Sequence, residues 1–221
     1  MSWDKEYDRS GHLWGEGPSE LGMAAVSYFQ THALSARTPE IVDIGCGYGR
    51  DTFYLLETIP CKITGIDTSE KAIEIARSES LKRQNKDVEF QRRDFGVMNR
   101  ERFDIVFASN LYQLLKKKER EEFRNMAERI LKPGGLLFLS TLSVSDPEHS
   151  GQGVPVPNDP NSYDIGKFLH FCTKEELARD FSFLEIRQLY EHEYDEPRAT
   201  GETHHHISWI LIGERIRKES A

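Results

Sequence analysis

Three alternating glycines follow a short apolar run in the sequence Val42-Asp43-Ile44-Gly45-Cys46-Gly47-Tyr48-Gly49-Arg50. Because glycine has no Cβ, such a loop turns tightly and lets the backbone approach a ligand closely. At the carboxyl edge of a parallel sheet, a loop of this kind is where nucleotide-like ligands bind. Dinucleotide-binding loops read G-x-G-x-x-G, but here the last glycine position is taken by Arg50. The spacing therefore disfavours a dinucleotide.

A carboxylate stands two residues before the first glycine, at Asp43. A pyrophosphate held by this loop would lie close to Asp43, and two neighbouring anions repel each other. The position suits a cationic ligand instead, such as the ammonium and sulfonium groups of S-adenosylmethionine. The alternative is a tight strand–helix turn in which Asp43 has no role in binding.

Two further acids follow later predicted strands. Asp67 ends the second strand, 22 positions after Gly45, which is about the spacing of a ribose-binding acid. Its alternative role is to cap the next helix, although Thr68 or Ser69 could also do so. Asp94 follows the third strand, where its carboxylate could accept a hydrogen bond from an adenine amino group, and Phe95 could cover the adenine ring.

Alternating strands and helices are expected to position these residues. Apolar spacing and turn residues predict strands at 41–44, 62–66, 88–92, 103–108 and 136–141, and helices at 21–34, 51–58, 69–80 and 116–131. Strands that alternate with helices form a mostly parallel, doubly wound sheet, so we predict an α/β fold.

The C-terminal third departs from this alternation. The segment 143–166 contains four prolines and three glycines, so we expect a long irregular loop that acts as a mobile lid. Thr173 is expected to cap a helix that runs through Arg179. Two extended segments, 184–191 and 204–212, are joined by a connection too short for a crossover helix, so they should pair antiparallel.

The order and spacing of these motifs resemble the class I S-adenosylmethionine-dependent methyltransferases. The resemblance extends over about residues 20 to 141 and rests on 42–50, 65–67, 93–95, 103–106 and 131–135. It implies a Rossmann-like sheet of seven strands with the last one antiparallel. It also implies S-adenosylmethionine as the cofactor, held by Asp43, Gly45, Cys46, Gly47, Gly49, Asp67, Thr68, Asp94, Phe95 and Asn110.

Within that family, Asp43 and the glycines would hold the methionine part, Asp67 the ribose and Asp94 the adenine. Asn110 would lie near the transferred methyl. A narrower set of residues is similar to the thiopurine and tellurite-resistance methyltransferases, namely Gly49-Arg50-Asp51, Trp3, Tyr7 and Trp14. This similarity favours a small-molecule acceptor with a sulfur, oxygen or nitrogen nucleophile.

We predict a single domain over residues 1–221, in which 1–35 form a helix and a segment that covers the substrate. The candidate substrate-pocket residues are Trp14, Tyr112, His149 and Tyr163. His170 lies where the predicted lid rejoins the domain and is the candidate general base. Its alternative role is structural, because it comes just before the expected helix cap at Thr173.

Composition narrows the choice of partners. The formal net charge is −8, which argues against nucleic acid, and the basic run 116–118 is followed at once by glutamates. No apolar run approaches the roughly 20 residues of a membrane-spanning helix. The first residues lack the apolar core of a signal peptide, and three cysteines form no C-x-x-C pair, so a cytoplasmic protein is expected. The oligomeric state is left open.

The sequence predicts no metal site. His204, His205 and His206 are adjacent, but successive residues of a strand point to opposite faces. At most His204 and His206 would then converge. Three other functions stay open besides methyl transfer: a nicotinamide-dependent oxidoreductase, a non-catalytic module that binds S-adenosylmethionine, and an aminopropyl transferase.

Overall fold

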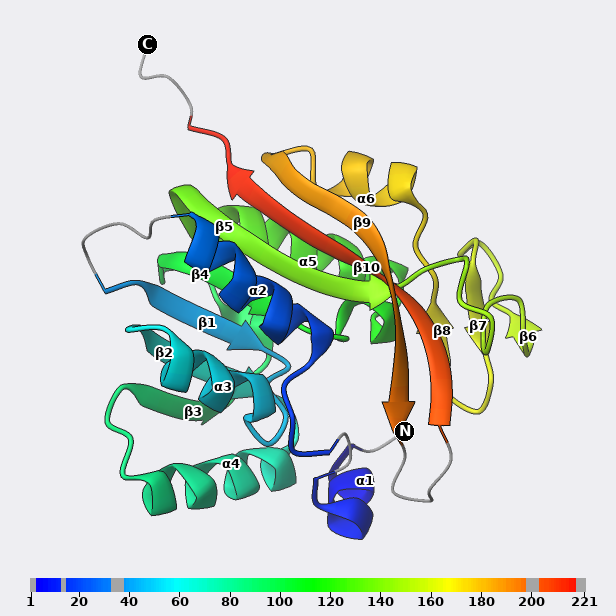
Figure 1. Cartoon of the computed structure of the whole chain (residues 1–221). Coiled ribbons are helices and arrows are strands. Elements are labelled where there is room, and N and C mark those ends of the chain that lie inside the picture. Colours follow the sequence, from blue (N-terminus) through cyan, green and yellow to red (C-terminus); the bar gives the residue numbers. More distant parts are fainter. Residues whose placement is uncertain (1–2, 13–14, 33–37, 198–202, 218–221) are drawn as a thin grey trace.

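The computed structural model describes residues 3–12, 15–32, 38–197 and 203–217. Its centre is a sheet of seven strands in the order β3-β2-β1-β4-β5-β10-β9 (Figure 1). The strands are β1 (Glu40–Ile44), β2 (Lys62–Asp67), β3 (Val88–Arg92), β4 (Phe103–Ala108), β5 (Leu131–Leu142), β9 (Leu184–Pro197) and β10 (Thr203–Arg215). The first five pair in parallel, and β10 is antiparallel to both β5 and β9. The predicted fold class is confirmed.

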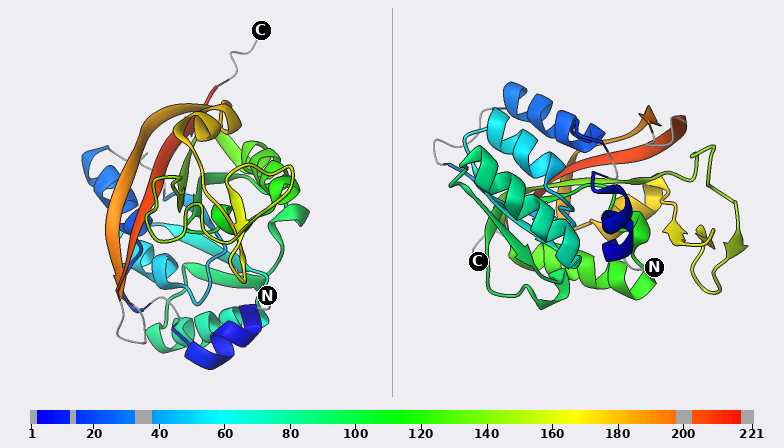
Figure 2. Two further views of the ribbon diagram at one scale, coloured as in Figure 1. Left: turned by 90° about the vertical axis from the view of Figure 1, so that its right-hand side faces the viewer. Right: turned by 90° about the horizontal axis from the view of Figure 1, so that it is seen from below.

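Helices cover both faces of the sheet, as the predicted doubly wound fold requires (Figure 2). On one face lie α2 (Glu20–Thr31), α3 (Arg50–Thr58) and α4 (Glu70–Arg83). On the other face lie α5 (Lys117–Ile130) and α6 (Lys174–Asp180). A further helix, α1 (Trp3–Ser10), packs against α4 beside the carboxyl ends of the strands.

The apolar strands are buried on both sides because their side chains alternate between two cores. In β1, Ile41 packs into the core under α2 and α3, whereas Val42 and Ile44 pack into the core under α5. All three side chains are at most 1% exposed. Each such burial stabilises the fold by about 1.5–3 kcal/mol, so the three apolar side chains of β1 favour its place at the centre of the sheet.

Side-chain caps set where the helices begin, and therefore where the cavity-facing loops end. The hydroxyl of Ser69 accepts a hydrogen bond from Ala72 N (3.1 Å) at the start of α4, and Thr173 accepts from Glu176 N (3.1 Å) at the start of α6. Both caps were predicted from the sequence and are confirmed. Ser19 caps α2 in the same way, through Gly22 N at 3.1 Å.

Three local features differ from the expectations. The helix α1 was not predicted. The strand β9 continues to Pro197, well past 191. The segment 143–166, expected to be irregular, contains β6 (Val154–Pro155) and β7 (Ser162–Asp164), which form a small sheet with β8 (Phe168–His170). In the described ranges, no helix is both long and apolar enough to cross a membrane.

Candidate active site

A cavity of about 420 Å³ opens at the carboxyl ends of β1, β2 and β4. This size falls within the usual range for small-molecule sites. The cavity is lined by nine of the ten residues predicted to bind the cofactor: Asp43, Gly45, Cys46, Gly47, Asp67, Thr68, Asp94, Phe95 and Asn110. The tenth, Gly49, is the residue that precedes α3.

The glycine loop is held by the neighbouring strand. Gly45 N and Cys46 N both donate hydrogen bonds to Ile66 O, at 2.8 and 3.0 Å. Gly47 adopts a left-handed conformation with φ +54°, which side chains with a Cβ disfavour. A Cβ added at Gly47 would lie 2.8 Å from the hydroxyl oxygen of Tyr7 on α1. The loop therefore needs glycine both for its backbone conformation and for the approach of α1.

Replacing this glycine tests the packing of α1 on the loop. We expect Gly47→Ala to destabilise the protein by more than Gly15→Ala. Both positions have positive φ, which costs alanine about 1–2 kcal/mol. Only at Gly47 would the new methyl group also meet a neighbouring atom, since a Cβ at Gly15 has nothing within 4 Å. Thermal unfolding of both variants gives the comparison, and equal losses would show that Tyr7 does not restrict the loop.

Asp43 is the most deeply buried acid of the cavity, with 2% of its surface exposed. The hydroxyl of Thr52 donates a hydrogen bond to its Oδ2. Burial raises the pKa of Asp43 to about 8; the nearby carboxylates of Asp51 and Asp67 also raise it, and the Thr52 hydrogen bond opposes the shift. A cationic ligand beside Asp43 would favour loss of its proton. The site is therefore suited to a positive charge.

Backbone N–H groups fix the two acids that follow β2 and β3. Asp67 accepts hydrogen bonds from Gly47 N (3.0 Å) and Ser69 N (2.8 Å). Burial raises the pKa of Asp67, and these hydrogen bonds oppose the shift. Asp94 accepts from Gly96 N (2.7 Å), and the Phe95 ring beside it is partly buried. Both carboxylates are thus oriented before any ligand binds.

A polar pair that follows β4 completes this half of the cavity. Asn110 has φ +52°, and its N–H donates to Ser140 Oγ at 3.1 Å. Gln113 is 7% exposed, and its Nε2 lies 3.5 Å from Asn110 Oδ1. Its Oε1 is buried without a hydrogen-bond partner, so a ligand donor at this point would satisfy it. Sequence reasoning missed Gln113, because no pattern distinguishes a buried glutamine after a strand.

Two aromatic residues of the N-terminal segment line the cavity, although of the aromatic residues there only Trp14 was predicted for the pocket. Trp3 and Tyr7 line the cavity from α1. Asp4 joins α1 to α4, because its Oδ1 accepts hydrogen bonds from Ser69 Oγ (2.6 Å) and Lys71 N (3.2 Å). Trp14, a predicted pocket residue, lies outside the described residues.

Three other predicted substrate-side residues are not among those that line the cavity. Tyr112 is buried in the core under α5, with its hydroxyl 3.2 Å from Asp180 Oδ2. Tyr163 packs against Phe171, with ring centroids 6.0 Å apart. His170 is 1% exposed, and its two ring nitrogens bond Ser162 Oγ (2.8 Å) and Glu176 Oε1 (2.9 Å). Both ring nitrogens of His170 thus have partners within the protein, and its role as general base stays a prediction.

The opposite end of the cavity is built by the C-terminal third of the chain. His149, Lys167, Tyr194, Glu196 and His206 line it. Among the predicted substrate-pocket residues that the structure describes, only His149 is in this lining. Burial lowers the pKa of His149; the Asp146 carboxylate opposes this shift, and His206 adds to it. The cavity thus has an acidic half at the glycine loop and a half rich in histidine beyond it.

The known proteins that this chain resembles are methyltransferases. Residues 41–135 match the family model described as a methyltransferase domain. The chain is 26% identical to "Ribosomal protein L11 methyltransferase" of Dictyoglomus thermophilum, over 59% of this chain and 40% of that protein. It is 32% identical to "Erythromycin 3''-O-methyltransferase" of Saccharopolyspora erythraea, over 54% of this chain and 45% of that protein. The chain thus spans less than half the length of these curated relatives.

Among solved structures, TehB from Haemophilus influenzae superposes with a TM-score of 0.67 at 16% identity, over 88% of this chain and 62% of that one. At this identity the similarity is one of fold. Residues 41–135 are thus similar to methyltransferase domains, and the larger part of the chain shares the fold of TehB.

Proposed function

We propose that this protein binds S-adenosylmethionine and transfers its methyl group to a small molecule. One observation carries the proposal: a single cavity combines the glycine loop with acids at the ends of three successive strands, namely Asp43, Asp67 and Asp94. These three carboxylates fit the cofactor, because the cationic, ribose and adenine parts of S-adenosylmethionine can each pair with one of them along the cavity.

Each residue has a separate task in this proposal. Asp43 pairs with the positive charge of the methionine part. Asp67 accepts from the ribose hydroxyls through the lone pairs that Gly47 N and Ser69 N leave available. Asp94 accepts from the adenine amino group, and Phe95 covers the ring. The buried Oε1 of Gln113 accepts from a donor on the bound molecules.

When bound, the cofactor supplies a methyl group on a sulfonium sulfur, which is already an excellent leaving group. The protein then has to align the acceptor in line with the sulfur–carbon bond and exclude water. Such positioning can supply roughly 7–11 kcal/mol of the barrier reduction. Trp3 and Tyr7 from α1 line one end of the cavity, and His149 from the 143–166 segment lines the other, which suits this task.

A small acceptor fits the enclosure better than a macromolecule does. Segments on both sides line a cavity of about 420 Å³, a size typical of small-molecule sites. The net charge of −8 gives no reason to expect a nucleic acid. One curated relative is named for ribosomal protein L11 and another for erythromycin, so the size of the cavity and not the relatives supports this choice.

Removing the ribose-binding acid tests the cofactor assignment. We expect Asp67→Ala to weaken binding of S-adenosylmethionine by about 1.5–3 kcal/mol, the range for hydrogen bonds to a charged group. The matched control is Asp87→Ala, an exposed acid that does not line the cavity. Isothermal calorimetry measures both variants, with NAD titrated into the wild type in parallel. Unchanged affinity in Asp67→Ala would remove the ribose assignment, and tight NAD binding would favour an oxidoreductase.

A further inference from the structure

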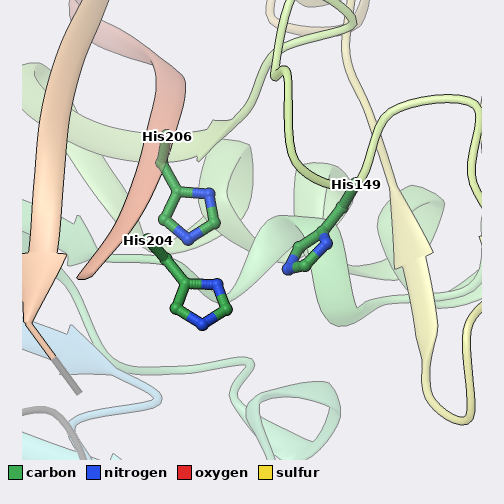
Figure 3. Close-up of side chains that lie close together, drawn as sticks. All are labelled: His149, His204 and His206. Atoms are coloured by element: carbon green, nitrogen blue, oxygen red, sulfur yellow. The ribbon is translucent and has the colours of Figure 1, made fainter. Parts of the chain in front are cut away.

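Three imidazole rings face one another at the histidine-rich end of the cavity (Figure 3). His204 and His206 are alternate residues of β10 and so point to the same side, and His149 reaches them from the loop after β5. The ring centroids lie 5.5 to 6.1 Å apart. One nitrogen from each ring lies within 4.8 Å of a nitrogen from each of the other two.

A buried carboxylate orients two of these histidines. Asp146 is 2% exposed, and its Oδ2 lies 2.9 Å from His206 Nδ1. Its Oδ1 accepts from the backbone N–H of His149 at 2.9 Å. When Nδ1 of His206 donates to a carboxylate, Nε2 is left as the nitrogen with a lone pair, which is the usual arrangement of a metal-binding histidine.

The third histidine has a ring nitrogen that makes no hydrogen bond within the protein. His204 Nδ1 is buried and has no hydrogen-bond partner. Glu148 Oε2 lies 3.1 Å away from it, so the two form an ion pair only when His204 is protonated. Buried polar atoms are almost always paired, so this nitrogen calls for a ligand. A cation bound among the three rings would satisfy it.

We propose that His149, His204 and His206 bind one divalent transition-metal ion. Neutral imidazoles suit zinc, iron, cobalt and nickel, whereas magnesium and calcium prefer oxygen ligands. At metal–nitrogen distances of about 2.0–2.1 Å, tetrahedral ligand nitrogens are roughly 3.4 Å apart. To bind a metal ion, the ring nitrogens therefore have to move closer to one another by little more than an ångström. The sequence indicated no metal site because only two of these residues are neighbours in the chain.

Three protein ligands leave a fourth position open, as in catalytic zinc sites. His149 and His206 line the same cavity as Asp43, so that position faces the acceptor end of the site. This part of the inference rests on the proposed function. An acceptor hydroxyl or thiol bound there loses its proton to water, and its electron pair forms the new bond to the methyl carbon. The sulfur–carbon bond breaks and leaves the neutral thioether.

Metal binding is measured directly and without the cofactor. The protein is purified with no histidine tag, dialysed against a chelator, and titrated with zinc and with cobalt. We expect one ion per chain, and visible absorption of cobalt in a four-coordinate site. His149→Gln and His204→Gln should each weaken zinc binding at least tenfold. No stoichiometric ion in the wild type would overturn the proposal.

The neighbouring His205 supplies the matched control. It lies between two of the proposed ligands, but its ring nitrogens pair with Asp195 Oδ1 (2.8 Å) and Glu193 Oε1 (2.7 Å) at an exposed edge. His205→Gln should bind zinc like the wild type. An equal loss of affinity in this variant would contradict the assigned ligands.

A second measurement separates the metal's role in methyl transfer from cofactor binding. Calorimetry with S-adenosylhomocysteine should give the same affinity in His204→Gln as in the wild type, because this residue does not line the cavity. Methyl transfer by this variant should fall at least tenfold. Failure of the wild type to bind the cofactor would refute the proposed function alone, and full transfer by the metal-free wild type would refute the metal's role alone.

Discussion

Asp43→Asn is expected to stabilise the free protein and, at the same time, to remove most of its affinity for S-adenosylmethionine. The stability gain arises because ionising a carboxyl that is 2% exposed is unfavourable, which raises its pKa to about 8. A group with a raised folded-state pKa stabilises the protein below its unfolded pKa, and this contribution is lost as the pH rises toward 8. At pH 8 we expect the variant to gain about 1 kcal/mol or more.

The loss of cofactor binding has a different cause, because the bound cation favours the ionised form of Asp43. Above pH 8, the wild-type carboxylate pairs with a cation inside the cavity, and truncating one partner of such a buried pair costs about 2–5 kcal/mol. Below pH 8, the wild type must release a proton to bind, so its affinity should fall toward tenfold per pH unit. Asp43→Asn should lack this dependence. Calorimetry from pH 6 to 9 measures it, and parallel pH profiles for the two proteins would contradict the role of Asp43.

Arg120→Ala is expected to destabilise the protein by about 3–5 kcal/mol, because it leaves a buried carboxylate without its partner. Arg120 on α5 donates to both oxygens of Asp159, at 2.6 and 3.3 Å, and to Leu115 O at 2.8 Å. The two side chains of the pair are 4% and 8% exposed. Asp159 lies between β6 and β7, so this pair fastens the 143–166 segment to the domain.

Burial would raise the pKa of Asp159, but the hydrogen bonds from Arg120 hold it below its ordinary value. The pair therefore stabilises the protein above the pKa of an unfolded aspartate, about 4, and this contribution is lost as the pH falls through the lowered pKa of folded Asp159. In urea unfolding, Arg120→Ala should therefore cost less stability at pH 3 than at pH 7. The control is Lys118→Ala, which removes an exposed pair with Glu122 worth at most about 1 kcal/mol. Equal costs for the two variants would contradict the anchoring role.

The ion pair between Arg120 and Asp159 is relevant to the prediction that residues 143–166 form a mobile lid. Asp159 holds one part of the segment, and Asp146 holds another through His206. Movement of the segment stays a prediction, and limited proteolysis with and without cofactor tests it. Cleavage is expected first at the exposed glycines 151 and 153, which lie between the two anchors.

The sequence predicts the sheet well because strand burial and helix caps are local signals. Ile41, Val42 and Ile44 form a run that only a strand covered on both faces can bury. Ser69 and Thr173 are caps whose hydroxyls act within three residues. The helix α1 gives a weaker signal, because Asp4 and Tyr7 hold it through contacts with α4 and the glycine loop rather than through its own pattern.

The residues that line the glycine-loop half of the cavity could be predicted because they end or follow strands in chain order. The other half depends on contacts between distant segments. His149 meets His204 and His206 across more than fifty residues of chain, and nothing in the sequence pairs them. The partners of His170 could not be predicted for the same reason, since Ser162 and Glu176 meet its two ring nitrogens only in the folded protein.

The central claim is methyl transfer to a small molecule, and a labelled methyl group tests it most directly. The protein is incubated with methyl-labelled S-adenosylmethionine and a panel of thiols, phenols, amines, carboxylates and chalcogen oxyanions, beside protein and RNA pools. The products are then separated by size. We predict label in a small product, formed by the wild type and strongly reduced in Asp67→Ala. Label found only in protein or RNA, or label that never leaves the cofactor in any pool, would contradict the account.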